Sequence, residues 1–209
     1  MATHWIWYIL GPLLVGGYAF WYVRRYLRNR ASYAAFAAER GWFYNERALE
    51  LLGHCNGEPF PLLPPTRPRT WHSVEGQRGY LRVRSFEYSW VRRRRSQSRR
   101  VFMQVTGIQL PFPAPAVYAE PRDVIGQFAR DLGFKRAGTG GEGFDQQWVT
   151  RGWVSPAMQQ WLNHHGRPIR VIGGVLETWE SGRFDPQRID PALAELEQLL
   201  PLLSGVSGR

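Results

Sequence analysis

Residues 79–110, GYLRVRSFEYSWVRRRRSQSRRVFMQVTGIQL, carry the strongest fold signal in the chain because they hold two runs of alternating apolar and polar residues. The runs Gly79–Val91 and Val101–Leu110 lie on either side of a polar, arginine-rich gap. Alternation with a period of two is typical of β-strands, and two such runs around a polar gap predict antiparallel strands joined by a long loop. The parity of the first run changes near Arg84 and Ser85, which predicts a β-bulge there.

The segments on both sides of this hairpin add helices and further strands, which capping residues, prolines and glycines delimit. The expected helices cover residues 24–40, 121–132, 155–166 and 190–203. The expected strands cover residues 117–119, 144–150, 169–172 and 175–179. Gly173-Gly174 predicts a two-residue hairpin between the last two strands. Prolines predict a loop over residues 54–69, since they remove amide donors from the backbone.

This order of elements predicts an α+β protein: an N-terminal transmembrane helix followed by a single domain with a mainly antiparallel sheet and about three to four helices. Residues 1–40 are expected to form the membrane anchor and a juxtamembrane helix, and residues 41–209 the cytoplasmic α+β domain. An apolar content of 44% excludes disorder of the whole chain. Cys55 is the only cysteine, so no internal disulfide is possible.

The predicted anchor is the uncharged run Trp5–Val23, WIWYILGPLLVGGYAFWYV. Its nineteen residues span about 28 Å as a helix, close to the hydrocarbon thickness of a bilayer. Aromatic residues gather at both ends, where amphipathic rings prefer the headgroup region. The residues expected at the membrane interface are Trp5, Trp7, Tyr8, Trp21, Tyr22, Arg24 and Arg25.

The flanks of this run predict the orientation of the anchor. The following segment RRYLRNR, residues 24–30, is positively charged and therefore stays in the cytoplasm. We expect a single-pass protein of the plasma membrane with its N-terminus outside and its C-terminal domain in the cytoplasm. A cleaved signal peptide is disfavoured because the charges follow the apolar run, and a buried core helix because the run has no polar face.

The net charge of +10 is concentrated in two arginine clusters. One is the segment 24–30 and the other is Arg92, Arg93, Arg94, Arg95, Arg99 and Arg100. The remaining chain is electrically balanced, which argues against a broad nucleic-acid-binding face. Two interpretations of the second cluster stay open: a solvated hairpin tip, or an anion-binding site for phosphates, which arginine forks match in geometry.

Several motif matches lack the context that their chemistry needs. Residues 138–143 match GxGxxG, but the expected order is helix before and strand after, the reverse of a dinucleotide-binding loop. Cys55 beside His54 has no base or oxyanion site placed by the sequence, and His164-His165 is unsuited to a shared metal. We therefore expect no catalytic residues, no metal site and no cofactor.

Five short segments resemble an uncharacterised family of bacterial proteins with an N-terminal membrane helix and a cytoplasmic domain. The segments are AAERGWFY (37–44), FEYSW (86–90), LPFPAP (110–115), EGFDQQWVT (142–150) and VLETWESGRFDP (175–186). The resemblance implies a membrane-tethered α+β domain, and it carries over no activity and no catalytic residue.

Three functions are compatible with these observations. The favoured one is a membrane-anchored accessory or interaction module that contacts anionic lipid headgroups through the arginine segment. The alternatives are a membrane-surface enzyme with an unrecognised site and a nucleic-acid-binding domain tethered to the membrane. The expected partners are the lipid bilayer and anionic lipids; the protein partner is undetermined, and nucleic acid is disfavoured because the aromatic strand next to the arginines is more typical of a core.

Overall fold

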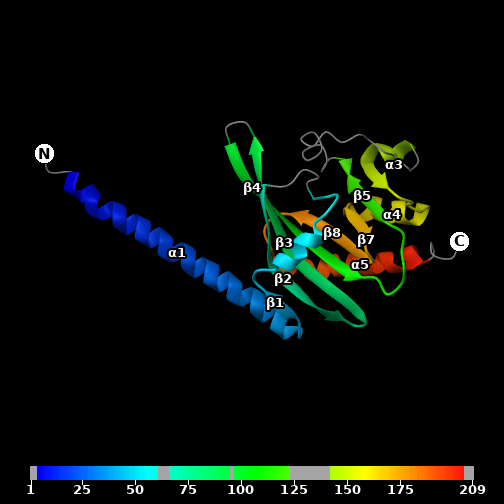
Figure 1. Cartoon of the computed structure of the whole chain (residues 1–209), viewed down its shortest axis with the longest axis horizontal. Coiled ribbons are helices and arrows are strands. Elements are labelled where there is room, and N and C mark those ends of the chain that lie inside the picture. Colours follow the sequence, from blue (N-terminus) through cyan, green and yellow to red (C-terminus); the bar gives the residue numbers. More distant parts are fainter. Residues whose placement is uncertain (1–3, 61–65, 95–96, 123–141, 205–209) are drawn as a thin grey trace.

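The computed structural model describes residues 4–60, 66–94, 97–122 and 142–204. Within these ranges, the side chains of residues 4–9, 11, 12, 66, 92–94, 97 and 142 lie outside the description. The fold is α+β, as predicted, and its centre is one eight-stranded antiparallel sheet with the strand order β1-β2-β3-β4-β8-β7-β5-β6. Figure 1 shows this sheet together with the long N-terminal helix.

The sheet and the helices have the following bounds. The strands are β1 (Phe43–Asn45), β2 (Thr66–Arg78), β3 (Leu81–Arg94), β4 (Gln97–Gln109), β5 (Val117–Pro121), β6 (Trp148–Arg151), β7 (Ile169–Ile172) and β8 (Val175–Ser181). The α-helices are α1 (His4–Glu39), α3 (Glu142–Gln147), α4 (Pro156–His165) and α5 (Ile189–Ser204). The short 3-10 helices are η1 (Leu49–His54) and η3 (Pro186–Arg188).

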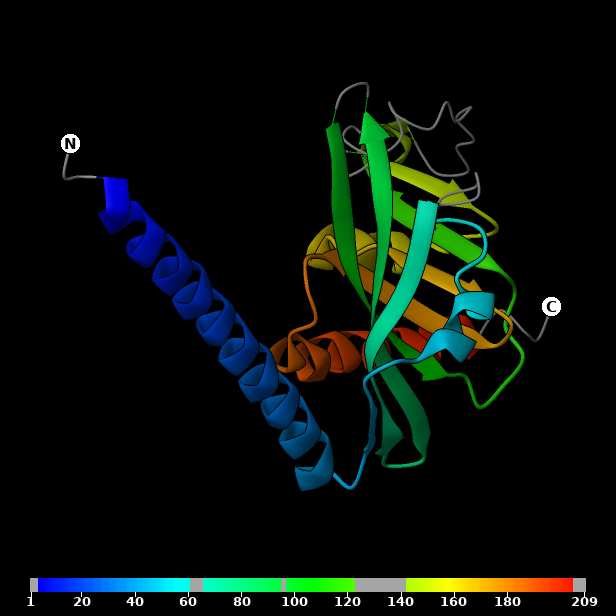
Figure 2. The same ribbon diagram turned by 60° about the vertical axis from the view of Figure 1, so that its left-hand side comes forward.

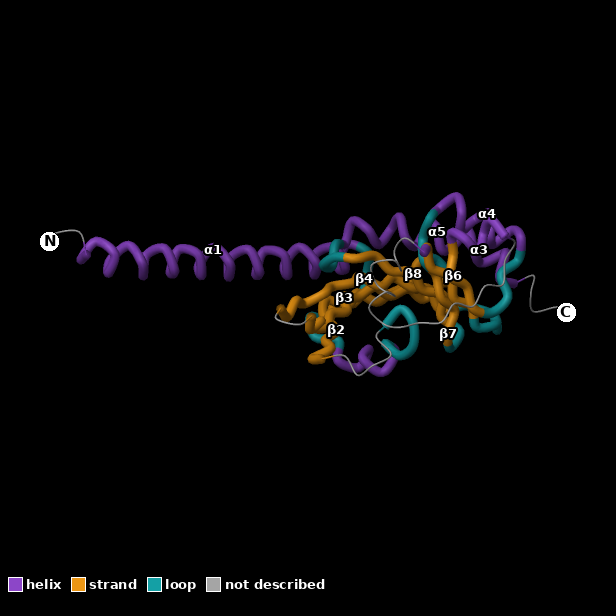
Figure 3. The backbone as a smooth tube through the Cα atoms, turned by 90° about the horizontal axis from the view of Figure 1, so that it is seen from above, coloured by secondary structure: helices purple, strands orange, loops and turns teal. Residues whose placement is uncertain are grey.

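Two hydrophobic clusters lie on opposite faces of the sheet, so the sheet is a middle layer (Figure 3). The α5 face carries Val83, Ile108 and Leu176, which pack with α4, α5 and the end of α1. The η1 face carries the aromatic side chains of β3, which pack beneath η1 and the loop that follows it. Each face is therefore covered by different elements.

This double coverage explains the change of parity within β3. The strand β3 itself has no bulge at Arg84 and Ser85, because it pairs with β4 in continuous register from Val83 to Arg94. Leu81 and Val83 point to the α5 face and Phe86 points to the η1 face, each buried where its own cover lies. The bulge predicted within β3 is wrong. The irregularities fall in the neighbouring strand β2, between Thr66 and Arg69 and between Trp71 and Val74, and the second lies opposite Ser85 and Glu87 of β3.

Local signals placed most of the remaining elements correctly. Ser155 caps α4 by accepting a hydrogen bond from the Met158 amide, and Gly166 ends the helix in the left-handed conformation. Gly173 and Gly174 both have positive φ in the turn between β7 and β8. Gly41, with φ of 67°, follows the end of α1 as expected.

Other predicted elements differ from the structure. The strand expected over 144–150 is helical as far as Gln147, and only β6 is extended. The loop expected over 54–69 ends earlier, because β2 begins at Thr66 and accommodates Pro68 at an irregular position near its end. A helix was expected over residues 121–132. Pro121, its expected first residue, is instead the last residue of β5, and residues 123–132 lie outside the described residues.

The helix α1 extends from the domain and is docked only by its C-terminal turns (Figures 1 and 2). Ala37 is buried in the core on the α5 face, with Tyr33 and Phe36 packed beside it. Every described side chain from Leu13 to Val23 is exposed. Within the residues that the structure describes, no helix is both long enough and apolar enough to cross a membrane.

Candidate anion-binding surface

The second arginine cluster lies on a two-stranded ribbon and not in the long loop that the sequence predicted. Strand pairing continues to the end of the hairpin, with Arg92 opposite Arg99 and Arg94 opposite Gln97. Only Arg95 and Ser96 separate the two strands, and both lie outside the described residues. Polar and charged residues can continue a ladder because its backbone hydrogen bonds do not depend on apolar side chains.

The ribbon extends beyond both neighbouring strands. Pairing of β2 with β3 reaches only as far as Thr66 opposite Val91, and pairing of β8 with β4 stops at Ser181 opposite Met103. Residues 92–94 and 97–99 therefore pair only with each other, and no third strand of the described sheet flanks the ribbon that they form. Arginines at these positions lie on a narrow projection that is open to a large ligand from several directions.

Arg100 is the best-defined arginine of this region. Its Nη1 donates to the Ser89 hydroxyl at 3.2 Å and weakly to the Arg67 carbonyl oxygen at 3.4 Å. Partial burial lowers the pKa of the Arg100 guanidinium, and repulsion from Arg69 and Arg67 lowers that pKa further. Arg67 and Arg69 of β2 and Arg100 of β4 are thus close enough to repel one another. The sequence had placed Arg67 and Arg69 in a loop.

Arg183 adds a further positive charge from the segment after β8. Its guanidinium lies 4.2 Å from the centre of the Phe102 ring, a cation–π distance. Phe102 is the strand-pairing partner of Ser89 on β4, and Arg69 is the partner of Ser89 on β2. The Ser89 hydroxyl also accepts the hydrogen bond from Arg100. We define the arginine surface as Arg67, Arg69, Arg99, Arg100 and Arg183.

Glu87 lies beneath this surface as a buried carboxyl group. It accepts a hydrogen bond from the Phe184 amide at 2.9 Å. Burial raises the pKa of Glu87, while the Phe184 amide and the positive charges of Arg183 and Arg100 lower that pKa in part. The carboxyl group therefore supports the segment that carries Arg183 and is shielded from an external ligand.

The aromatic residues of β3 are not part of the arginine surface. Phe86, Tyr88 and Trp90 are buried on the η1 face, where the Phe60 ring packs edge-on against the Tyr88 ring. Stacking on nucleic-acid bases needs exposed rings. These three rings are therefore not available for the role in single-strand binding that the sequence left open.

The residues expected at the membrane interface lie in α1. Trp21, Tyr22, Arg24 and Arg25 are exposed, and the Arg25 guanidinium lies 5.3 Å from the Trp21 ring centre. The Tyr18 ring contacts the rings of both Trp21 and Tyr22. The side chains of Trp5, Trp7 and Tyr8 lie outside the described residues.

The residues considered for catalysis are held in structural roles. Cys55 is buried, its thiol donates to the Leu51 carbonyl oxygen, and burial raises its pKa to about 12, which disfavours the nucleophilic thiolate. His54 uses its backbone carbonyl oxygen to accept a hydrogen bond from Arg170. His164 and His165 have ring centres 4.8 Å apart, and among the described residues no group of three or more potential ligands could hold a metal.

Open clefts lie elsewhere among the described residues, and two of them have a defined lining. One, of about 420 Å³, is lined by Glu75, Arg82 and Arg84, and the other, of about 600 Å³, lies between the β2–β3 turn and α5. The buried carboxyl groups with raised pKa, Glu87 and Glu120, line neither of them. The GxGxxG segment lies mostly outside the described residues, and its last glycine, Gly143, is in α3.

The burial of Glu120 predicts a pH-dependent stability. Burial raises the pKa of Glu120 despite hydrogen bonds from Tyr118 and Trp179. A raised carboxyl pKa contributes stability that is complete below the unfolded pKa of about 4.3 and is lost as the pH rises through the folded value. Glu120→Gln keeps a neutral acceptor, so we expect it to stabilise the protein by roughly 1 kcal/mol at pH 7.

The measurement is the unfolding midpoint of both proteins as a function of pH. The variant should melt about 2–4 °C higher at pH 7, and the difference should vanish towards pH 4. Glu39→Gln is the control, because Glu39 is exposed. A pH-independent difference would show that Glu120 is ionised equally in the folded and unfolded chains.

Comparisons with known proteins found no matching family model, no matching curated protein and no matching solved structure.

Proposed function

We propose that the protein is a membrane-anchored interaction module in which the N-terminal part of α1 is inserted in a lipid bilayer and the domain carries an anion-binding surface. The single observation that carries the proposal is the apolar, exposed part of α1. Leu13, Leu14 and Val15, together with Phe20 and Val23, are all more than half exposed although they are apolar. Such a helix surface is stable only when lipid or another apolar partner covers it.

The sequence supports lipid as this cover. The uncharged run begins at Trp5, before the part of α1 whose side chains are described, and continues to Val23. Gly16 and Gly17 have open space around them and would weaken a helix in water, but glycines are frequent in membrane helices. Aromatic side chains and arginines then follow in the order expected at a membrane boundary.

The charges after the run support a cytoplasmic domain. Arg24, Arg25 and Arg28 are exposed on α1 between the apolar run and the docked turns. Arginines that flank a membrane helix remain on the cytoplasmic side. The domain on that side presents its positive charges on a projecting ribbon, which suits contact with a large anionic partner better than the enclosure of a small substrate.

The test is extraction of the full chain from cell membranes with alkaline carbonate. We expect the chain to stay in the membrane pellet, and a variant with both Leu14→Arg and Val15→Arg to move to the supernatant. Each arginine at the centre of a membrane helix costs about 2.5–3.5 kcal/mol of insertion free energy.

The matched control is Tyr80→Arg, which adds a charge at an exposed position of the domain. It should remain in the pellet. Protease resistance of the domain in all three proteins would show that the fold is intact. Recovery of the unaltered chain in the supernatant would overturn the proposal.

A further inference from the structure

We infer that the arginine surface binds the phosphate groups of anionic phospholipids in the leaflet that α1 enters, and that the junction between α1 and the domain directs it there. This inference rests on the proposed membrane anchor. It adds a second contact with the same bilayer and identifies Arg67, Arg69 and Arg183 as part of that contact. It also assigns a role to the docked turns of α1, which hold the domain in one orientation.

The first part of the junction joins α1 to the segments that follow it. The Tyr26 hydroxyl donates to Glu46, and Arg30 forms an ion pair with the same carboxylate at 3.1 Å. The Tyr33 hydroxyl donates to the Phe184 carbonyl oxygen at 3.1 Å. Residues three or four apart share one side of a helix, so these side chains form a single stripe that faces the domain.

The second part of the junction closes the end of α1 onto the sheet and α5. Arg40 pairs with Asp190 at 2.7 Å, and Arg78 of β2 pairs with the same carboxylate at 3.2 Å. The Trp42 indole donates to the Gln77 carbonyl oxygen at 2.9 Å. Contacts with β2, α5 and the segment after β8 therefore fix the direction of α1 relative to the sheet.

The arginine surface shares a sheet face with this junction. Val74 on the α5 face pairs with Ser85, and the same side of β3 carries Ser89, which pairs with Arg69 and Phe102. Arg100 bonds Ser89 on this side. The guanidinium groups of Arg69 and Arg100 therefore lie on the face against which α1 packs. Arg99, the next residue along β4, points to the other face of the same narrow ribbon.

The arrangement of the elements directs the hairpin towards the membrane. In Figures 1 and 2, α1 runs from its docked end near β1 towards the side on which the free end of the β3–β4 hairpin lies. The turn between β2 and β3 lies at the opposite end of the sheet. Once the apolar part of α1 is in lipid, the end of the hairpin faces the headgroups and the β2–β3 turn faces away from them.

Arginine is suited to this contact because its planar fork binds two phosphate oxygens at once. The cytoplasmic leaflet has a negative surface potential that falls off within a Debye length, so only basic residues held close to the leaflet gain from it. A lipid partner needs no aromatic platform, whereas a single-stranded nucleic acid does. The buried rings of β3 therefore favour the lipid.

The test measures how close each end of the sheet lies to the bilayer in the full chain. Ser98 at the hairpin end and Tyr80 at the β2–β3 turn are both exposed, and each is replaced by cysteine and labelled with a fluorophore. Cys55 is buried with a raised pKa, so the unaltered protein gives the labelling background. The labelled proteins are reconstituted in nanodiscs of phosphatidylcholine, with or without phosphatidylglycerol, that contain a headgroup-attached quencher.

We expect the Ser98→Cys probe to be quenched about threefold more strongly in nanodiscs with phosphatidylglycerol than in nanodiscs without it. This ratio means that the hairpin end contacts the headgroups about three times as often when the anionic lipid is present. The Tyr80→Cys probe should be insensitive to lipid composition. Combining Ser98→Cys with Arg69→Gln and Arg99→Gln should abolish the dependence on phosphatidylglycerol. The same probe with Arg82→Gln and Arg151→Gln, which remove an equal charge elsewhere, should retain it.

The outcomes separate this inference from the anchor on which it rests. A chain that does not incorporate into nanodiscs of either composition contradicts the proposed anchor. Incorporation with equal quenching of the Ser98→Cys and Tyr80→Cys probes overturns the headgroup contact alone. Strong, salt-dependent binding of a single-stranded oligonucleotide by the incorporated protein, without any effect of phosphatidylglycerol, would replace the lipid by nucleic acid.

Discussion

Replacing Arg170 by methionine is expected to cost about 3–5 kcal/mol of unfolding free energy, because it leaves a buried carboxylate with an incomplete set of partners. Glu177 is 0% exposed, and its Oε2 accepts from Arg170 Nε at 2.6 Å. Its other oxygen, Oε1, accepts from Arg84 Nη2 at 2.7 Å. Removing Arg170 from this trio leaves Arg84, which is partly exposed, as the remaining ion-pair partner.

Arg170 also holds the loop after η1 against the sheet. Its guanidinium donates to the backbone carbonyl oxygens of His54, Asn56 and Glu58, each at 3.1 Å, and lies 4.5 Å from the Phe60 ring centre. The variant would leave these carbonyl oxygens without their donor. We therefore expect the cover of the η1 face to loosen together with the ion pair.

Denaturant unfolding in detergent micelles, followed by tryptophan fluorescence, measures this effect. Arg188→Met is the matched control, because Arg188 is 40% exposed and its ion pairs with Glu180 and Asp185 are 3.7 and 3.6 Å long. Exposed pairs of this kind contribute about 0–1 kcal/mol. Equal losses in the two variants would contradict the structural role of Arg170.

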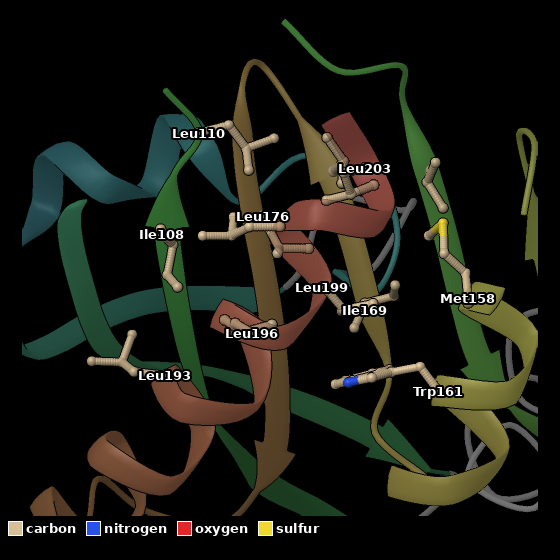
Figure 4. Close-up of a cluster of buried hydrophobic side chains, with 14 of the residues drawn as sticks. Ile108, Leu110, Met158, Trp161, Ile169, Leu176, Leu193, Leu196, Leu199 and Leu203 are labelled. Atoms are coloured by element: carbon tan, nitrogen blue, oxygen red, sulfur yellow. The ribbon is translucent and has the colours of Figure 1, made fainter. Parts of the chain in front are cut away.

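Leu196→Ala is expected to lower the unfolding free energy by about 2–5 kcal/mol, through lost transfer free energy and the cavity left behind. Leu196 is 0% exposed and lies on the side of α5 that faces the sheet, between Leu193 and Leu199 (Figure 4). Ile108 and Leu176 belong to the same buried cluster, so the gap opens within the core.

The same unfolding measurement distinguishes this core effect from the loss of any leucine. Leu49→Ala in η1 is the control, since Leu49 is 61% exposed and its truncation is expected to change stability by less than about 0.5 kcal/mol. A loss below about 1 kcal/mol for Leu196→Ala would mean that α5 can close the gap by moving towards the sheet.

Local signals made α5, α4 and the β7–β8 hairpin predictable. The leucine stripe of α5 repeats at helical spacing, and all its expected members, Leu193, Leu196, Leu199, Leu200 and Leu203, are buried. A cap or a turn acts over a few residues, so the sequence alone contains its physical cause. The double glycine at 173–174 is of this kind.

The strand β2 was missed because its cause is not local. Arg67 and His72, with φ of 55° and 52°, interrupt its alternation next to register shifts, and Pro68 lies between them. Pairing with β1 and β3 stabilises these irregular positions, and no pattern within residues 66–78 encodes that pairing. The parity change in β3 was misread for a similar reason, since it depends on what covers each face.

The candidate site was predictable in part. Arg99 and Arg100 belong to a charge cluster that the sequence shows directly, but Arg67, Arg69 and Arg183 join them only through strand pairing and a ring contact. Isolated arginines in a proline-containing segment or after a strand carry no signal of their own. The membrane anchor, the lipid contact and the resemblance to an uncharacterised family stay predictions.

The docked turns of α1 determine where the chain can be cut without harm. Ala37 is 1% exposed in the core, and Tyr33 and Phe36 pack beside it, so a fragment that begins at Trp42 would have a hole in its hydrophobic interior. Cleavage of the exposed stretch between Val23 and Tyr26 would instead release a domain that keeps all the helix residues of its hydrophobic core. A protease acting at that point would separate the intact domain from the exposed apolar part of α1 in a single step.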